Sequence, residues 1–309
     1  MKNDESKSFK GFTAAPMTGF NPDGSINLDI VQSYANMLNA NGISGVFVNG
    51  TTGQGLSLSV EERKALAECW VKFTPSGLRV IVHVGHKDQS QSNVMAIHAN
   101  EIGADAVAMM VPSFNLKSVH SLVDYIQMTA NLVPSLPFYY YHIPSETNLF
   151  LPMIELLKVS QKTITNFAGI KYTHADDLAD FKLCKEFCDG KYEILFGCDE
   201  FLIDGLKIGA QSAVGSTYNI MAPLYDELVN AFQSGDLHYS NNLQEISKNT
   251  CSLLYATGSF RSGLKAVMKM IGIDLGNIRA PDLNLSSKTI NELKSSLKSI
   301  GMLNFLNKV

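Results

Sequence analysis

Eight short apolar runs, separated by segments of helical length, are the feature that most restricts the fold of this chain. Most of the runs are continuously apolar rather than alternating, as expected for parallel strands covered on both faces. We predict strands at 12–15, 45–48, 80–84, 106–111, 138–141, 167–171, 193–196 and 212–214.

The segments between the runs carry helix start and stop signals. Ser59 to Glu62 has the pattern of a capping box, and Gly42 and Gly103 follow apolar-periodic segments where a helix would end. Strand and helix therefore alternate about every 20–35 residues, as in βαβ units. Eight such repeats predict a (β/α)8 barrel. A doubly wound open sheet is the alternative, but the turn at 15–19 lacks its G-x-G-x-x-G pattern.

Beyond about residue 221 the strand signal does not return. Four helical segments are predicted there, at 223–234, 240–254, 262–271 and 288–299. We assign the first of these to the barrel. The predicted division is a catalytic barrel at 1–235 and a helical extension at 236–309 that packs on it.

Composition narrows the class of protein. The chain has 309 residues, 45% of them hydrophobic, which is enough for one large core. A net charge of −4 gives no electrostatic reason to expect nucleic acid or an anionic membrane as partner. Five cysteines without a C-x-x-C pair, no signal-peptide pattern and no membrane-length apolar run predict a cytoplasmic protein in a reducing compartment.

In a (β/α)8 barrel the functional residues lie at the C-terminal ends of the strands. The second run ends in a turn at 49–55, where three glycines accompany Thr51 and Thr52. Such a turn can direct N–H groups and hydroxyls at a carboxylate or phosphate. It can equally be an ordinary flexible turn.

A lysine, Lys171, ends the sixth run, which is otherwise apolar. Burial there would lower its pKa and leave a neutral amine able to attack a carbonyl. The alternative is a lysine that extends its charged end into water.

Other strand ends add polar groups. Tyr141 ends the fifth run and is either a proton carrier or a packed aromatic. Asp199 and Glu200 follow the seventh run, as helix caps or as acceptors for a polyhydroxylated ligand. Ser216 follows the eighth run. His83 and His86 would point to opposite faces of a strand, so we predict no metal site. The set suits an α-keto acid: Lys171 forms an imine, Tyr141 moves a proton, and the threonine turn holds the carboxylate.

Three of these segments resemble the pyruvate-dependent Schiff-base lyases, the class I aldolase family that includes the dihydrodipicolinate synthases. Residues 49–53 resemble the family's carboxylate loop, 141–144 its proton-relay segment, and 169–173 its Schiff-base strand. The similarity runs in order from about Phe9 to Asn219, and the helical tail also fits.

Within the family, the segments at 47–60, 137–144, 195–200 and 215–219 resemble the branch that cleaves sialic acid. This resemblance implies reversible cleavage of N-acetylneuraminate to N-acetyl-D-mannosamine and pyruvate, through an imine at Lys171 and without a metal or organic cofactor. It also implies a homotetramer. By the same resemblance the sugar-derived part would contact Thr173, Gly197, Asp199, Glu200 and Ser216.

Three positions depart from the family pattern. Gln54 stands where a glutamate is usual, and Phe114 replaces a tyrosine that many relatives use to relay a proton. Glu146 stands where the synthases have an arginine that binds an aldehyde's carboxylate, which argues against the synthase activity and leaves sugar specificity open. The alternatives are a related aldolase for another aldehyde and a catalytically silent binding barrel.

Overall fold

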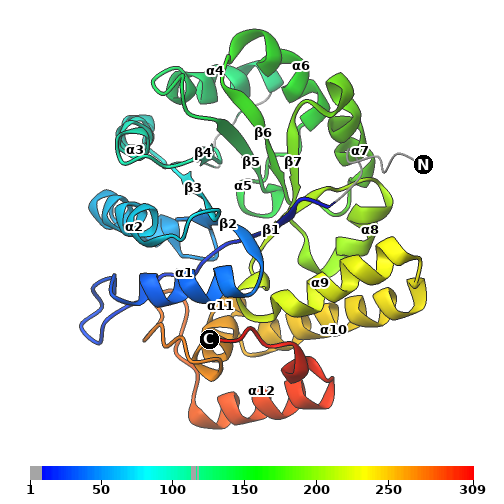
Figure 1. The fold of residues 1–309 in the computed structure, drawn as a ribbon. Helices are drawn as coiled ribbons and strands as arrows, with labels where there is room; N and C mark the ends of the chain where they lie inside the picture. Colours follow the sequence, from blue (N-terminus) through cyan, green and yellow to red (C-terminus); the bar gives the residue numbers. More distant parts are fainter. Residues whose placement is uncertain (1–8, 113–115, 117) are drawn as a thin grey trace.

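Eight parallel strands close into a barrel in the order β1 to β8, and β8 pairs with β1 (Figure 1). The computed structural model describes residues 9–112, 116 and 118–309. The predicted (β/α)8 barrel is confirmed. Its strands are β1 Gly11–Ala14, β2 Ile43–Val48, β3 Arg79–His83, β4 Ala106–Met109, β5 Phe138–His142, β6 Phe167–Tyr172, β7 Glu193–Phe196 and β8 Ser212–Gly215.

Helices surround the strands, as Figure 1 shows. The described residues also form the short 3₁₀ helices η2 to η5, at 55–57, 187–190, 199–201 and 302–305. None of the described helices has the length and hydrophobicity that a membrane span requires. The α-helices are α1 Ile30–Ala40, α2 Val60–Phe73, α3 Gln89–Glu101, α4 Val119–Ala130, α5 Pro144–Thr147, α6 Met153–Thr163, α7 Leu178–Glu186, α8 Leu202–Lys207, α9 Tyr218–Ser234, α10 Leu237–Ala256, α11 Phe260–Met270 and α12 Ser287–Ser299.

The predicted helix signals act as expected in α2. The Ser59 side chain accepts a hydrogen bond from the Glu62 backbone, and the Glu62 side chain accepts one from the Ser59 backbone. This reciprocal pair satisfies two N–H groups that the first helical turn leaves without partners. Gly42 and Gly103 adopt positive φ after α1 and α3.

Two apolar layers hold the barrel. Side chains that point inward fill its centre, among them Phe47, Tyr139, Tyr141 and Leu195. Alternate residues such as Tyr140 point outward and pack against the helices. Tyr139 and Tyr141 share the inner face, as the two-residue period of a strand requires.

The far end of the barrel interior holds a polar cluster that joins four strands, β3, β5, β7 and β8. Glu193 accepts hydrogen bonds from Arg79 at 3.0 Å, from the Tyr139 hydroxyl at 2.6 Å and from Ser212 at 3.3 Å. Burial alone would raise the pKa of Glu193, but Arg79 and these hydrogen bonds lower it. Polar side chains thus occupy the interior at this end, whereas the cavity that holds Lys171 lies at the other end.

Three sequence predictions need correction. The eighth barrel helix begins at Tyr218 rather than at 223, because Pro223 lies inside α9 after an irregular backbone at Met221. Strand β4 ends at Met109, two residues before the predicted end. The four-residue spacing of Cys184 and Cys188 predicts that they share one turn of a helix, but Cys188 lies beyond α7 with positive φ.

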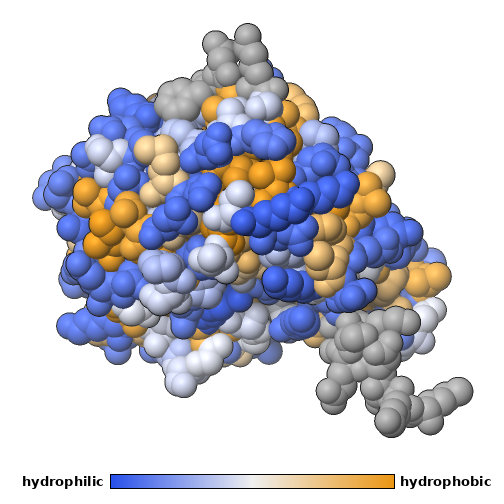
Figure 2. All heavy atoms as spheres, turned by 90° about the horizontal axis from the view of Figure 1, so that it is seen from above, coloured by the Kyte–Doolittle hydropathy of each residue, from blue (hydrophilic) through white to orange (hydrophobic). Residues whose placement is uncertain are grey.

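The C-terminal helices α10 to α12 lie together at one side of the barrel, below α9 and α1 in Figure 1. The predicted division at 235 falls at the link between α9 and α10 and stays a prediction. Figure 2 shows that the face seen there is largely hydrophilic, with smaller hydrophobic patches between polar residues.

Candidate active site

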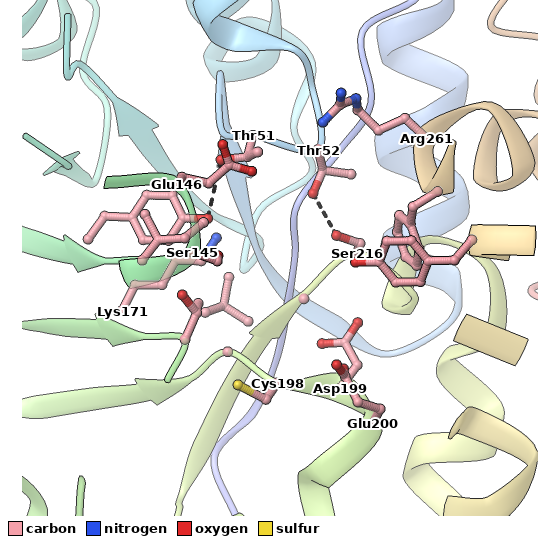
Figure 3. Close-up of a pocket in the computed structure, with 18 of the residues that line it drawn as sticks. Thr51, Thr52, Ser145, Glu146, Lys171, Cys198, Asp199, Glu200, Ser216 and Arg261 are labelled. Atoms are coloured by element: carbon pink, nitrogen blue, oxygen red, sulfur yellow. Dashed lines mark hydrogen bonds between the residues drawn. The ribbon is translucent and has the colours of Figure 1, made fainter. Parts of the chain in front are cut away.

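A cavity of about 480 Å³ lies at the C-terminal ends of the strands (Figure 3). Strand ends form one wall, and the helical extension forms the other. The structure brings all nine residues singled out in the sequence to this cavity: Thr51, Thr52, Tyr141, Lys171, Thr173, Gly197, Asp199, Glu200 and Ser216.

The amine of Lys171 is buried inside this cavity. Lys171 is only 4% exposed, and its Nζ lies 4.0 Å from the ring centroids of both Phe47 and Tyr141. Burial lowers the pKa of Lys171 to about 7, although the charges of Asp199 and Cys198 oppose the shift. A substantial fraction of the amine is therefore uncharged at neutral pH and able to attack a carbonyl carbon.

Tyr141 lies opposite Lys171, because the two residues are paired in the register of β5 and β6. Its hydroxyl is 3.4 Å from the Thr51 Oγ1. Burial raises the pKa of Tyr141 far above its usual value, and the charges of Glu146 and Asp199 add to the effect. The resting phenol is therefore protonated and can give a proton to a group formed at Lys171.

The turn after β2 brings Thr51 and Thr52 to the cavity. Thr52 Oγ1 is hydrogen-bonded to Ser216 Oγ at 2.6 Å, which joins the ends of β2 and β8. The Thr18 hydroxyl donates to the Gly53 carbonyl at 2.6 Å and anchors the turn from below. Within the described chain, the backbone N–H groups of Thr51 and Thr52 have no acceptor. Free N–H groups beside hydroxyls suit a carboxylate.

Asp199 is held rigidly beside the amine. Its Oδ2 accepts hydrogen bonds from the Thr217 N–H at 2.8 Å and from the Thr217 hydroxyl at 2.6 Å. Its Oδ1 is buried and has no partner among the described residues. A Cβ on Gly215 would lie 1.6 Å from Oδ1, so only glycine permits this approach. Burial raises the pKa of Asp199, and burial together with the Asp199 charge raises that of Glu200.

Two further predicted residues shape the wall between β6 and β7. The Thr173 hydroxyl and N–H both donate to the His142 carbonyl, at 2.8 and 3.0 Å. Gly197 packs against Thr173: a Cβ at Gly197 would lie 2.4 Å from the Thr173 Cγ2. Any other residue at 197 would displace the threonine from the cavity wall.

Sequence reasoning missed the contribution of the helical extension. In α10, Gln244 and Ser247 donate to the Asp199 carbonyl at 3.1 and 3.4 Å, so this helix positions Asp199. Ser145 was also missed. The extension lines the mouth with Tyr255, Gly258, Ser259, Phe260, Arg261 and Asp282. Helical periodicity indicates that these segments pack, but not which end covers the barrel.

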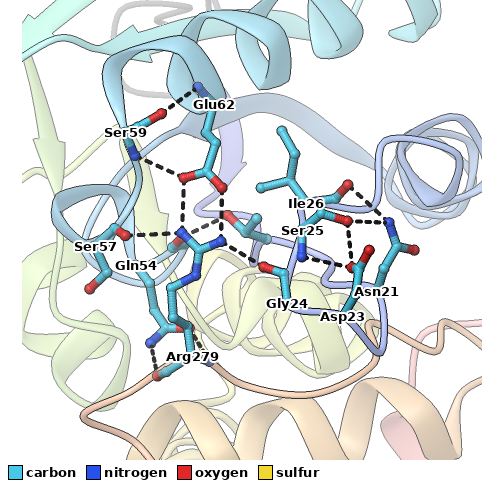
Figure 4. Close-up of polar contacts among 12 residues, drawn as sticks. Asn21, Asp23, Gly24, Ser25, Ile26, Gln54, Ser57, Ser59, Glu62 and Arg279 are labelled. Carbon is cyan, nitrogen blue, oxygen red and sulfur yellow. Dashed lines mark hydrogen bonds and ion pairs between the residues drawn. The ribbon is translucent and has the colours of Figure 1, made fainter.

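Gln54 connects the turn after β2 to the extension. Its side chain donates to the Arg279 carbonyl at 2.8 Å and to Asp282 Oδ2 at 3.2 Å. Arg279 also donates to both carboxylate oxygens of Glu62, at 2.8 and 2.9 Å, and to the Gly24 carbonyl at 2.7 Å (Figure 4). An amide at 54 can donate to Asp282, whereas the usual glutamate would repel it.

Glu146 and Phe114 are the other two positions that depart from the family pattern. Glu146, in α5, lines the cavity near Tyr141, whose pKa its charge raises. Phe114 lies outside the described residues, so the proposed loss of a proton relay stays a prediction.

The histidine considered as a metal ligand is part of the scaffold. His83 Nδ1 lies 3.1 Å from the Asn49 carbonyl, and Nε2 accepts from the Met110 N–H at 3.3 Å. Burial, and to a smaller extent the charge of Arg63, lowers the pKa of His83 well below its usual value. No group of three or more metal-ligating side chains occurs in the part of the chain that is described.

Known proteins resemble this chain over nearly its full length. The model of the dihydrodipicolinate synthetase family matches residues 8–300. The N-acetylneuraminate lyase of Rattus norvegicus is 36% identical over 97% of this chain and 95% of its own, and that of Xenopus tropicalis 41% over 89% and 91%. The structure of the Proteus mirabilis N-acetylneuraminate lyase superposes with a TM-score of 0.91 at 36% identity, covering 97% of this chain and 100% of that one.

Proposed function

Because the chain belongs to the dihydrodipicolinate synthetase family, we propose that it is a lyase that reversibly cleaves N-acetylneuraminate to N-acetyl-D-mannosamine and pyruvate. The observation that carries the proposal is the buried amine of Lys171, with its lowered pKa, at the centre of the cavity. Relatives named for this activity are 36% and 41% identical to the chain, which supports the choice of substrate.

The first step joins Lys171 to the open-chain sugar. The neutral amine attacks the C2 ketone, a proton passes from nitrogen to oxygen, and a carbinolamine forms. Tyr141 then gives its proton to the departing hydroxyl, which leaves as water. The products are an iminium at Lys171 and a phenolate at Tyr141, whose opposite charges stabilise each other in the buried cavity.

The second step breaks the C3–C4 bond. The Tyr141 phenolate takes the proton of the C4 hydroxyl, C4 becomes the aldehyde carbon, and the bonding electrons pass into the iminium to give an enamine. Tyr141 gives this proton to C3 of the enamine, which restores the iminium, and water then hydrolyses the iminium to release pyruvate and the free amine of Lys171. We propose that no metal or organic cofactor is needed, because the iminium itself accepts the electrons.

The residues that line the cavity account for how the substrate is bound. The Thr51–Thr52 turn holds the carboxylate through its free N–H groups and hydroxyls. Asp199 and Glu200 accept hydrogen bonds from the sugar hydroxyls, and the unpaired Oδ1 of Asp199 supports this role, since a buried oxygen without a donor is costly. Thr173, Gly197 and Ser216 complete the sugar site. On the family resemblance we also propose a homotetramer.

The test of the function is direct. Purified protein incubated with N-acetylneuraminate should release equal amounts of pyruvate and N-acetyl-D-mannosamine. Turnover only of 2-keto-3-deoxy sugar acids would assign another aldehyde. No turnover, together with no pyruvyl adduct after borohydride reduction, would overturn the enzyme proposal in favour of a silent binding barrel.

The lowered pKa of Lys171 predicts that the rate of imine formation depends on pH near neutrality. The ammonium form has no lone pair, so imine formation should rise as the pH increases through about 7, where Lys171 loses its proton, and level off above it. The initial rate of borohydride trapping with pyruvate measures this. A midpoint near 10.5, the ordinary lysine value, would show that burial does not act on the amine.

A substitution at Glu200 separates sugar binding from imine chemistry. Glu200→Gln keeps the shape but removes the charge, so we expect the KM for N-acetylneuraminate to rise about tenfold. Pyruvate trapping at Lys171 should be unchanged, because pyruvate lacks the sugar hydroxyls. Glu245→Gln, on the exposed part of α10, is the matched control. An equal loss in both assays would argue against a role for Glu200 in binding the sugar.

A further inference from the structure

Arg261 lies at the mouth of the cavity, in the first turn of α11. It is the second residue of α11, and its side chain is 29% exposed. In the view of Figure 3 its guanidinium points toward the side of the cavity where Thr52 lies. A cation in the first turn of a helix is disfavoured by the helix dipole. Helix stability therefore does not explain this arginine.

A fixed anion, Asp282, holds one edge of the guanidinium. Arg261 Nε donates to Asp282 Oδ2 at 2.6 Å. The same carboxylate accepts from the Ser259 hydroxyl at 2.6 Å and from Gln54 Nε2 at 3.2 Å. Burial opposes the charge of Asp282, but the hydrogen bonds from Arg261 and Ser259 outweigh it and lower the pKa. Asp282 is thus a stable anion that orients the arginine.

The rest of the guanidinium is left for a ligand. Among the described residues, neither Nη1 nor Nη2 of Arg261 has a hydrogen-bond partner. Among the described residues that line the cavity, Lys171 is the only other cation, and its amine becomes part of the imine. The remaining charged groups are acids, which can only accept hydrogen bonds from a ligand when ionised. An acceptor oxygen on the ligand therefore finds its charged donor at Arg261.

We propose that Arg261 determines specificity by donating hydrogen bonds from its terminal nitrogens to the acyl carbonyl oxygen of an N-acylated amino sugar. The inference rests on the proposed function and names the part of the substrate that this wall recognises. Sugar hydroxyls can donate to Asp199 and Glu200, whereas an amide carbonyl only accepts. Gln54 takes part indirectly, because its amide lets Asp282 stay beside the turn that holds the carboxylate.

The synthesis direction tests this assignment. Arg261→Met keeps an unbranched apolar stem in place of the aliphatic part of arginine and removes every side-chain N–H group. With pyruvate as the second substrate, the KM for N-acetyl-D-mannosamine should rise about tenfold, as expected for loss of a hydrogen bond from a charged donor. The KM values for D-mannose, which lacks the acyl group, and for pyruvate should stay within about twofold. Lys269→Ala, on the exposed side of the same helix, is the matched control and should change none of these values.

A second variant keeps the test decisive if Arg261→Met does not fold. Asp282→Asn retains the arginine but loosens its orientation, so a smaller rise confined to N-acetyl-D-mannosamine is expected. Equal losses with both aldehydes, or no selective loss in either variant, would overturn the assignment. A wild-type protein that traps pyruvate but does not turn over N-acetyl-D-mannosamine would instead overturn the proposed function.

Discussion

Replacing Lys171 with arginine is expected to abolish turnover, by at least about 10⁴-fold. Arginine preserves the positive charge and most of the length, but it cannot lose its proton in a protein. No nucleophilic amine then remains among the described residues that line the cavity. The measurements are pyruvate release from N-acetylneuraminate and borohydride trapping with pyruvate, each followed by mass spectrometry of the peptide that contains residue 171.

The chain carries its own control for this experiment. Lys265 is also buried, and burial lowers its pKa to about 7. Its Nζ, however, donates to the carbonyls of Thr18 and Asn277, and Lys265 does not line the cavity. Trapping in the wild-type protein should therefore label Lys171 and leave Lys265 unmodified. Labelling of Lys265 instead, or residual turnover by Lys171→Arg, would contradict the assignment of the nucleophile.

Replacing Tyr141 with phenylalanine is expected to lower kcat by about 10²–10⁴-fold, the usual range for the loss of a proton-transfer group. Phenylalanine fills the same space beside Phe47 and Lys171, so the cavity should keep its shape. Imine formation should slow but remain detectable by trapping, because Lys171 is intact. Comparing kcat with the yield of the trapped adduct separates proton transfer from attack by the amine.

Tyr140 provides the matched substitution. It is the preceding residue of β5, is fully buried, and points to the opposite side, toward the helices. Its hydroxyl has no hydrogen-bond partner among the described residues, so Tyr140→Phe should leave kcat within about twofold. If the two variants had the same activity, Tyr141 would not be the proton carrier.

The barrel could be predicted because its signals are local. A continuous apolar run specifies a strand buried on both faces, and the residue that ends the run is at the mouth by the geometry of the fold. Lys171 and Tyr141 were found in this way, one strand at a time. Their pairing across β5 and β6 needed only the strand order.

The errors and omissions have a different origin. Pro223 suggested a helix start, but packing against the barrel carries α9 across it from Tyr218. Arg261 and Asp282 carry no sequence signal for a site, because they follow no strand. They reach the cavity only because α10 and α11 fold back over the open end of the barrel.

The sequence by itself determined the strand repeats, the barrel and the residues at its strand ends, since each depends on side chains close together in the chain. The tertiary structure alone decided how the helical extension meets them. It lets Gln244 donate a hydrogen bond to the Asp199 carbonyl. It also brings Asp282, the partner of Arg261, next to Gln54, although Gln54 and Asp282 are 228 residues apart in the chain. Such contacts depend on how the helices of the extension pack against the barrel. That packing is determined by the complementary shapes of the two surfaces, which no short sequence pattern encodes.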